Sequence, residues 1–320
     1  MIQLRTLGNS DLEISPIGLG VIQFAGGSRV LQSVLPAIPK QERVGIVKTA
    51  LEGGINWFDT SELIGTGRSE EYLAEALDGI GEFSQQAMIA TKWSPYIRFP
   101  GNIKKTIHDR LEKLAPYPIG LYQIHKPNLY SSLKAEMNAM ADLMEDGKIR
   151  AIGVSNFTPD QMRQAQAALK KRGLGLASNQ VQYSLLNRKI EVNGVLETAR
   201  ELGISLIAWA PLASGILTGK FHKKPEILAR IPSVRRRKLE KQLETSWPVI
   251  EILDEIAAKY NSEPAQVALA WLIHQGKDIV AIPGASRLGH VLEGIRAMDL
   301  QLSEEDITRL DRASSNFRVE

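Results

Sequence analysis

Three side chains of different chemical types, Asp59, Lys92 and His125, each stand at the end of a short apolar run. A lysine beside an aspartate forms a charge pair that tunes a nearby proton donor, and a histidine is the usual polar orienter or acid. One isolated charge at such a place more often belongs to a structural ion pair. Three different types at successive strand ends favour catalysis instead, and they predict proton transfer at a reacting oxygen.

Alternating strands and helices would bring these three residues together. Eight short runs rich in Ile, Val, Leu and aromatics are typical of strands buried on both faces. The runs are Ser15–Gly20, Ile55–Asp59, Ala87–Lys92, Gly120–His125, Ala151–Ser155, Ser178–Gln182, Ser205–Ala210 and Ile279–Pro283. The amphipathic segments between them are Gln41–Glu52, Ser69–Leu77, Ile103–Leu114, Ser132–Glu145, Thr158–Lys170, Val195–Leu202, Ser246–Tyr260 and Ser286–Ala297. Eight such pairs in 320 residues favour an α/β fold of the (β/α)8 TIM-barrel type over an open sheet.

Two further elements fall outside this repeat. Residues 2–16 predict an N-terminal β-hairpin that turns at Gly8–Asn9 and covers the bottom of the barrel. Residues 303–315 predict an extra C-terminal helix with Ser303 as its cap. Because no linker or low-complexity tract interrupts the chain, we expect residues 1–320 to form a single domain.

Two connections are longer than the others, at residues 23–40 and 212–245, and both follow the carboxyl end of a strand. Barrel enzymes build their sites from the loops at that end. The second connection is the most basic stretch of the chain. Such a charge run is either a solvated loop and helix face or a clamp for phosphate groups across the mouth of the barrel.

Composition excludes several other classes of protein. Lys and Arg number 39 against 36 Asp and Glu, a net charge of +3 that is spread along the chain, so we expect no nucleic-acid partner. No apolar run approaches a membrane span, and the opening residues lack the apolar region of a signal peptide, so we expect a cytoplasmic protein without a membrane partner. Zero cysteines exclude disulfides and thiolate chemistry. The five histidines show no HxxxH or HExxH spacing, so no metal site is predicted.

Seven ordered blocks resemble the signature blocks of the aldo-keto reductases. They read GINWFDTSELIGTGRSEEYLAEAL, IATKW, LYQIHKPN, IGVSNF, SNQVQYSLL, IAWAPLASGILTGK and AIPGASRLGHVLEGI, in the family's order and with its spacing. The resemblance implies a (β/α)8 barrel that binds NADPH, less often NADH, without a Rossmann domain. It also implies hydride transfer to a small-molecule carbonyl substrate, an aldehyde or a ketone.

The resemblance assigns roles to individual positions. Asp59, Lys92 and His125 match the family's catalytic aspartate, lysine and histidine. The matching cofactor-binding positions are Ser155, Asn156, Gln180 and Trp209 at the nicotinamide, Leu212, Ser214, Gly215, Leu217 and Lys220 at the pyrophosphate, and Ser286, Arg287, His290 and Glu293 at the adenosine end. A hydroxyl and a guanidinium at a helix start suit a 2′-phosphate, which favours NADP(H), with NAD(H) as the alternative.

One catalytic position departs from the family. Ile64 stands where the family has its proton-donating tyrosine, and an isoleucine cannot donate a proton. His125 is then the first candidate acid and Lys92 the second, and the phenols of Tyr96 and Tyr183 are further candidates at the rim. Loss of a positioned acid costs about 10²–10⁴ in rate, so we expect weakened or altered carbonyl reduction with cofactor binding retained.

Two other functions fit the same sequence. The chain could be a cofactor-binding sensor or interaction protein that keeps the barrel but has lost turnover. It could also be a barrel enzyme with different chemistry at the same mouth, which the absence of NADP(H) binding would favour. For the reductase, we expect pocket walls from Ile22, Phe24, Ile64, Trp93 and the loop after the seventh strand.

Overall fold

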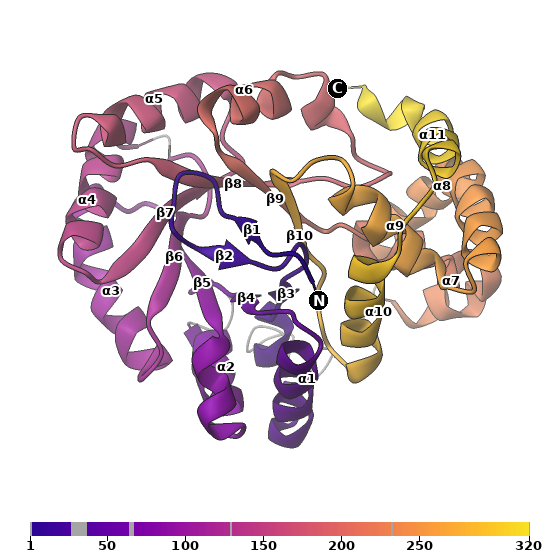
Figure 1. Cartoon of the computed structure of the whole chain (residues 1–320), viewed down its shortest axis with the longest axis horizontal. Helices are drawn as coiled ribbons and strands as arrows, with labels where there is room; N and C mark the ends of the chain where they lie inside the picture. The colour runs from indigo at the N-terminus through magenta and orange to yellow at the C-terminus, as the bar shows by residue number, and fades with distance from the viewer. Residues whose placement is uncertain (1, 27–36, 64–66, 129, 232, 320) are drawn as a thin grey trace.

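The computed structural model describes residues 2–26, 37–63, 67–128, 130–231 and 233–319. Figure 1 shows a ring of helices around a central sheet, viewed with the N-terminal hairpin in front of the sheet. The hairpin consists of β1 (Arg5–Thr6) and β2 (Glu13–Ile14), which pair antiparallel. The predicted N-terminal hairpin is therefore present over the expected residues.

The central sheet has eight parallel strands that follow one another in chain order. They are β3 (Leu19–Gly20), β4 (Trp57–Asp59), β5 (Met88–Trp93), β6 (Ile119–Ile124), β7 (Ile149–Ser155), β8 (Leu176–Gln182), β9 (Ser205–Trp209) and β10 (Ile279–Ile282). Parallel bridges from Ile17 to Ala281 and from Gly20 to Gly284 join the last strand to the first. The Gly18 N–H donates to the Ala281 carbonyl at 2.9 Å across this seam. The sheet closes on itself, which confirms the predicted (β/α)8 barrel.

Most helices lie where the apolar periodicity places them. Seven agree with their predicted bounds to within three residues: α1 (Lys40–Glu52), α2 (Arg68–Asp78), α3 (Pro100–Leu114), α4 (Leu133–Glu145), α5 (Pro159–Lys170), α6 (Val195–Leu202) and α10 (Leu288–Asp299). The predicted C-terminal helix is α11 (Glu304–Ala313). Short helical turns complete the loops: η1 (Ile22–Ala25), η3 (Gly81–Gln86), η4 (Lys189–Glu191), η5 (Ala213–Thr218), α7 (Lys220–Lys223), η6 (Pro225–Arg230) and η7 (Ser315–Arg318).

Two helices differ from the prediction. Helix α8 covers Ser233–Lys259, so the basic stretch expected in a long connection is helical well before its predicted start at residue 246. Leu239 and Ile250 are both buried on one side of α8. The apolar residues of this side are far apart in the sequence and charged residues stand between them, so they show no clear helical period. Helix α9 (Pro264–Ile273) was not predicted as a barrel helix, because all ten of its residues are buried and no polar face marks its period.

Several helix ends carry capping signals that can be read from the sequence, such as Thr158 three residues before Gln161. Thr158 accepts the Gln161 N–H and Gln161 returns a bond to the Thr158 N–H, which completes the capping box of α5. The Ser303 hydroxyl accepts the Asp306 N–H at 3.2 Å and caps α11. Gly203 after α6 and Gly54 after α1 take left-handed φ values of 66° and 82°. These local signals fix where α5, α6 and α11 begin or end.

The hairpin lies across the bottom of the barrel, and the Arg5 side chain makes several of the hydrogen bonds that hold it there. Arg5 donates to the carbonyl oxygens of Gly276 at 3.0 Å and Ile273 at 2.8 Å, and also to that of Ile279. These carbonyls belong to the end of α9 and the start of β10. Arg5 therefore ties the hairpin to the connection between α9 and β10.

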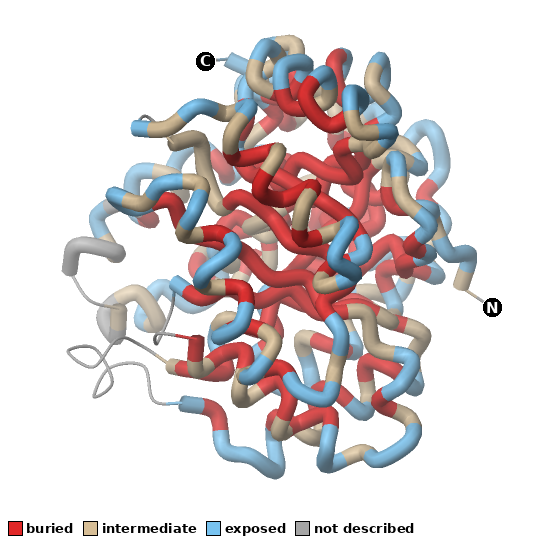
Figure 2. Tube along the Cα trace, turned by 90° about the vertical axis from the view of Figure 1, so that its left-hand side faces the viewer, coloured by how far each residue is buried: buried red, intermediate tan, exposed pale blue. Residues whose placement is uncertain are grey.

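The core has two parts. One apolar cluster fills the lower barrel interior and includes Leu7 and Ile14 of the hairpin region together with Trp57 and Leu121 of the strands. A larger cluster lies between the strands and the surrounding helices. Figure 2 shows the buried trace concentrated in the strands at the centre and the exposed trace on the outer turns. Among the described residues, no helix is both long and apolar enough to cross a membrane.

Candidate functional site

The charged pair predicted from the strand ends lies inside the barrel. Lys92 at the end of β5 places its Nζ 2.5 Å from Asp59 Oδ2 at the end of β4, and both side chains are 1% exposed. Lys92 Nζ also donates to the Thr60 carbonyl at 3.0 Å. A buried ion pair must gain enough Coulomb energy and hydrogen bonding to offset its desolvation. Here, two of the three ammonium hydrogens have partners.

Two buried amides complete the surroundings of the aspartate. Asp59 Oδ1 accepts a hydrogen bond from Gln180 Nε2 at 3.0 Å and another from Gln123 Nε2 at 3.2 Å. Gln180 was predicted from the resemblance as a nicotinamide ligand, and its amide faces Asp59 here. Gln123 was missed, although its position two residues before His125 puts both on the inner face of one strand. The inward alternation was therefore a usable signal.

His125 follows β6 and lies next to two serine hydroxyls. Its Nδ1 is 3.3 Å from Ser61 Oγ and 3.3 Å from Ser94 Oγ. Burial lowers the pKa of His125 to about 4, and the positive charge of Lys92 adds to the shift. The imidazole is therefore neutral at pH 7. The sequence did not single out Ser61 or Ser94, because their meeting depends on how two loops pack together.

A buried carboxylate joins those two loops. Glu62 accepts the Ser94 backbone N–H at 2.7 Å and the guanidinium groups of Arg98 at 2.6 Å and Arg110 at 2.7 Å. Arg110 Nε also lies 2.8 Å from Oε2 of Glu70, without hydrogen-bond geometry. Burial raises the pKa of Glu70 to about 7. The sequence indicated none of these contacts among Glu62, Arg110 and Glu70, which lie next to Asp59, Lys92 and His125 but do not include them.

The structure places the remaining candidates for the rim of the barrel in different surroundings. Ile64 lies outside the described residues. Tyr96 is 52% exposed in the loop after β5, with Lys126 Nζ 3.7 Å from its ring centroid. Tyr183 is buried and donates to Glu191 at 2.9 Å, so its phenolic hydrogen already has an acceptor. Trp93 was expected in the pocket wall, but it is fully buried and its indole N–H donates to Asn102 of α3 at 3.0 Å, behind the sheet.

The predicted nicotinamide-binding residues meet at the ends of β7, β8 and β9. The Ser155 hydroxyl donates to the Gln180 carbonyl at 2.8 Å, and Asn156 Nδ2 donates to Ser155 Oγ at 3.0 Å. Asn156 takes a left-handed φ of 60°, and its Oδ1 accepts the Trp209 indole N–H at 3.1 Å. The structure thus brings these four residues into one hydrogen-bonded group, which leaves the Trp209 ring half-buried.

The turn after β9 has an unusual backbone. Ala213, Ser214 and Gly215 take consecutive left-handed φ values of 47°, 57° and 91°. Non-glycine residues rarely adopt this conformation, and it concentrates at ligand-binding sites. The N–H groups of Gly215 and Leu217 both donate to the Leu212 carbonyl, at 2.8 and 3.3 Å. Those two predicted phosphate donors therefore serve the turn itself.

The predicted adenosine-binding residues gather at the start of α10, where Arg287 is the N-cap residue. Arg287 Nε lies 2.9 Å from His290 Nε2, and the Ser286 backbone N–H lies 3.3 Å from His290 Nδ1. Burial, followed by the charge of Arg287, lowers the pKa of His290 to about 4. Burial also raises the pKa of Glu293. The guanidinium of Arg287, the Ser286 backbone N–H and the imidazole of His290 thus lie together at the amino end of α10.

The two candidate sets come from different parts of the chain. Asp59, Lys92 and His125 belong to β4 to β6, whereas the cofactor candidates begin at Ser155 of β7 and continue through α10. Their strands nevertheless end at the same mouth, because all eight run parallel.

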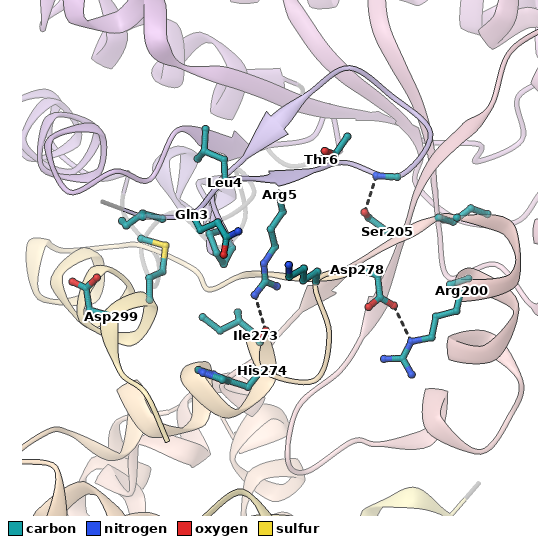
Figure 3. A pocket seen from close by; sticks show the side chains of 18 of the residues that line it. Gln3, Leu4, Arg5, Thr6, Arg200, Ser205, Ile273, His274, Asp278 and Asp299 are labelled. Atoms are coloured by element: carbon teal, nitrogen blue, oxygen red, sulfur yellow. Dashed lines mark hydrogen bonds and ion pairs between the residues drawn. The ribbon is translucent and has the colours of Figure 1, made fainter. Parts of the chain in front are cut away.

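A cavity of about 800 Å³ lies at the opposite end of the barrel. Figure 3 shows Arg5 reaching from the hairpin toward Ile273, and Arg200 paired with Asp278 across the same space. These residues come from the hairpin, from the carboxyl ends of α6 and α9 and from the loop before β10. The cavity is therefore separate from the mouth that carries the catalytic candidates.

A family model described as "Aldo/keto reductase family" matches residues 16–315. An uncharacterised oxidoreductase of Mycobacterium tuberculosis is 35% identical over 96% of this chain and 91% of its own. The chloroplastic pyridoxal reductase of Arabidopsis thaliana is 32% identical over 95% of this chain and 84% of its own.

Solved structures are similar over nearly the whole chain. A glycerol dehydrogenase from Gluconobacter oxydans has a TM-score of 0.80 at 26% identity, and the match covers 98% of this chain and 96% of that one. A thermostable aldo-keto reductase in complex with the inhibitor epalrestat has a TM-score of 0.76 at 28% identity, with 97% and 99% covered.

Proposed function

Because the chain belongs to the aldo/keto reductase family, and is an oxidoreductase of that family, we propose that it reduces aldehydes or ketones with NADPH. The observation that carries this proposal is the buried Asp59–Lys92 pair beside a neutral His125, at the carboxyl ends of three adjacent strands. Aldo-keto reductases generally use nicotinamide cofactors. The preference for NADP(H) over NAD(H) is part of our proposal.

The residues of the second half of the barrel fit such a cofactor. The Cβ position of Gly215, which has a φ of 91°, is 3.0 Å from Lys220 Nζ, so the ammonium lies directly against the strained turn. We assign the pyrophosphate to the surface of this turn, with the Ser214 hydroxyl and Lys220 as its partners. The Trp209 ring, held by Asn156, suits stacking against a flat ring. Ser286 and Arg287 would hold a 2′-phosphate at the start of α10.

Each group at the mouth then has a defined task. When bound, NADPH supplies the hydride. The neutral His125 orients the carbonyl oxygen through a hydrogen bond, and its lowered pKa makes the imidazolium too scarce at pH 7 to be the main acid. The ammonium of Lys92 stabilises the negative charge that develops on that oxygen. Asp59, which accepts from Gln123 and Gln180, keeps the ammonium in place.

Proton delivery is the weak step of the proposed reaction. With Ile64 at the family's tyrosine position, the proton comes from Lys92 or from a water next to it. Reduction is then slower than with a positioned phenol by up to about 10²–10⁴.

The substrate we propose has a bulky or apolar group. Ile64 replaces a phenol with an aliphatic side chain, and large apolar side chains are exposed on the loops after β4, β5 and β6. They are Leu63 at 43%, Tyr96 at 52%, Ile97 at 85%, Phe99 at 62% and Tyr130 at 69%. Exposed apolar groups gathered around a site mark a binding surface for a ligand of the same character.

Two measurements test the proposal. NADPH binding, followed by fluorescence quenching, should give a finite Kd, and a panel of aliphatic and aromatic aldehydes that includes pyridoxal should oxidise NADPH, fastest with bulky apolar members. Ile64→Tyr should raise kcat on small aldehydes by about 10²-fold or more, because it restores a phenol. If Ile64→Tyr leaves all rates unchanged, Ile64 does not limit proton delivery.

Ile64 also favours a second candidate function, a sensor or interaction protein that binds the cofactor without turnover. Tight NADPH binding with no oxidation by any carbonyl compound, and restoration of turnover in Ile64→Tyr, would establish this alternative.

A further inference from the structure

His125 has two hydroxyl neighbours on one ring nitrogen and none on the other within the described residues. Ser61 Oγ and Ser94 Oγ each lie 3.3 Å from Nδ1. The two serines come from different loops, one after β4 and one after β5. A neutral imidazole carries its proton on one nitrogen, and the bond made by the other nitrogen decides which.

The hydrogen-bond partners of Ser61 favour a bond that runs from its hydroxyl to Nδ1. Ser61 Oγ accepts the Leu63 backbone N–H at 3.1 Å, which uses one of its two lone pairs. Among the described residues, Nδ1 of His125 is the acceptor within reach of the Ser61 hydroxyl hydrogen, and a bond from the hydroxyl to Nδ1 gives that hydrogen a partner. An Nδ1 that accepts carries no hydrogen, so the proton resides on Nε2.

The two hydroxyls are held in place by Glu62. This carboxylate is next to Ser61 in sequence and accepts the backbone N–H of Ser94 at 2.7 Å. It is 5% exposed and is fixed by Arg98 and Arg110. The positions of the two serines relative to His125 therefore depend on one buried, doubly paired group and not on loose surface loops.

We propose that Ser61 and Ser94 are positioning residues that hold His125 as the Nε2–H tautomer and leave that N–H to orient the substrate oxygen. The idea rests on the proposed reductase activity, for which it supplies the orienting donor. Nδ1 has one lone pair, so a single hydroxyl satisfies it at a time. The second serine can substitute for the first, and the two substitutions should act together more strongly than the sum of their separate effects.

The tautomer itself can be measured without turnover. Nitrogen NMR of the ¹⁵N-histidine-labelled protein, with His125→Asn used to assign the signals, should show a protonated Nε2 and a non-protonated Nδ1 at pH 7. The double variant Ser61→Ala/Ser94→Ala should show a mixture of tautomers. Ser84→Ala removes a buried serine at the other end of the barrel and should leave the His125 signals unchanged.

Kinetics give the second readout. Each single alanine variant should lower kcat/KM for aldehyde reduction about twofold to threefold, and the double variant about tenfold or more. The NADPH Kd should be unchanged. Ser61→Thr and Ser94→Thr keep a hydroxyl and should retain both the rate and the tautomer, which a merely structural role for the serines would not require.

Two results would overturn the proposal: a protonated Nδ1 in the wild-type protein, or a double variant with the wild-type tautomer. Failure of the proposed function is a separate outcome. If no carbonyl compound is reduced, the NMR result still decides whether the serines set the tautomer.

Discussion

The mouth of the barrel combines groups that burial pushes in opposite directions. His125 is kept neutral, with a pKa of about 4 against an ordinary value of 6.5, whereas Glu70 behind it has a pKa of about 7 against 4.5. Both shifts disfavour the charged form, which is the expected effect of desolvation. At the residue scale, these two groups therefore make the free energy of unfolding depend on pH in opposite directions.

The His125 shift predicts acid sensitivity. Between pH 6.5 and 4 the unfolded chain binds a proton at this residue that the folded chain does not, so the free energy of unfolding falls as the pH falls through this window. His125→Gln should flatten the slope in part, because His290 carries the same shift. Urea unfolding at pH 4 to 7.5 measures it, and an unchanged slope would contradict the assigned pKa.

The Glu70 shift predicts the reverse trend. The folded carboxyl stays protonated up to about pH 7, whereas the unfolded one ionises above 4.5, so its contribution to stability is present below pH 4.5 and is lost as the pH rises through 7. Glu70→Gln keeps the shape without a titrating proton. Its free energy of unfolding, relative to wild type, should increase between pH 5 and 8 in urea titrations; a constant difference would count against the raised pKa.

The sequence could place Asp59, Lys92 and His125 because each follows an apolar strand, and parallel strands of a barrel end at one mouth. It could not place Ser61, Ser94 or Glu62 around them, because those contacts arise between loops. No periodicity in the chain encodes how loops pack against each other.

At the scale of elements, helix ends marked by local sequence signals were predicted better than helices defined by their burial. The capping box of Thr158 fixed the start of α5 from four residues alone, whereas α9 escaped prediction because a wholly buried helix has no amphipathic period. Helix α8 began earlier than predicted because its buried stripe runs through a basic stretch. Helix boundaries that depend on residues close together in the sequence could be predicted, whereas those that depend on burial against other elements could not.

The capping box gives a prediction at this scale. Thr158→Ala removes the side-chain acceptor at the start of α5 and should lower the free energy of unfolding by about 1 kcal/mol. Thr158→Ser keeps the hydroxyl and should be nearly neutral. Denaturant unfolding of both variants checks the difference, and equal stabilities would show that the cap contributes nothing.

At the scale of the whole molecule, the barrel separates stability from chemistry. The hairpin and the Arg5 contacts lie at the bottom, and the catalytic candidates lie at the mouth. The strand–helix alternation predicted this closed architecture well. The contact between Arg5 and the end of α9 could not be foreseen, because it joins residues 268 to 274 positions apart.

Arg5→Met tests the separation. It leaves buried carbonyls without their cationic donor and should cost about 2–3 kcal/mol of the free energy of unfolding, with NADPH affinity unchanged. Arg150→Met is the matched control, because Arg150 forms an exposed pair with Asp11 and should cost less than about 1 kcal/mol. Equal losses, or a weakened NADPH affinity in Arg5→Met, would contradict this division.

The order of the two candidate sets along the chain has an evolutionary consequence. A genetic crossover between α4 and β7 would fall after His125 and before Ser155, and would exchange the proton-handling half of one relative for that of another in a single event. On the assignment proposed above, such a chimaera would take its nucleotide-binding residues from one parent and its proton-handling residues from the other. Recombination at this point would then change the residue at position 64 and leave the proposed cofactor-binding residues together.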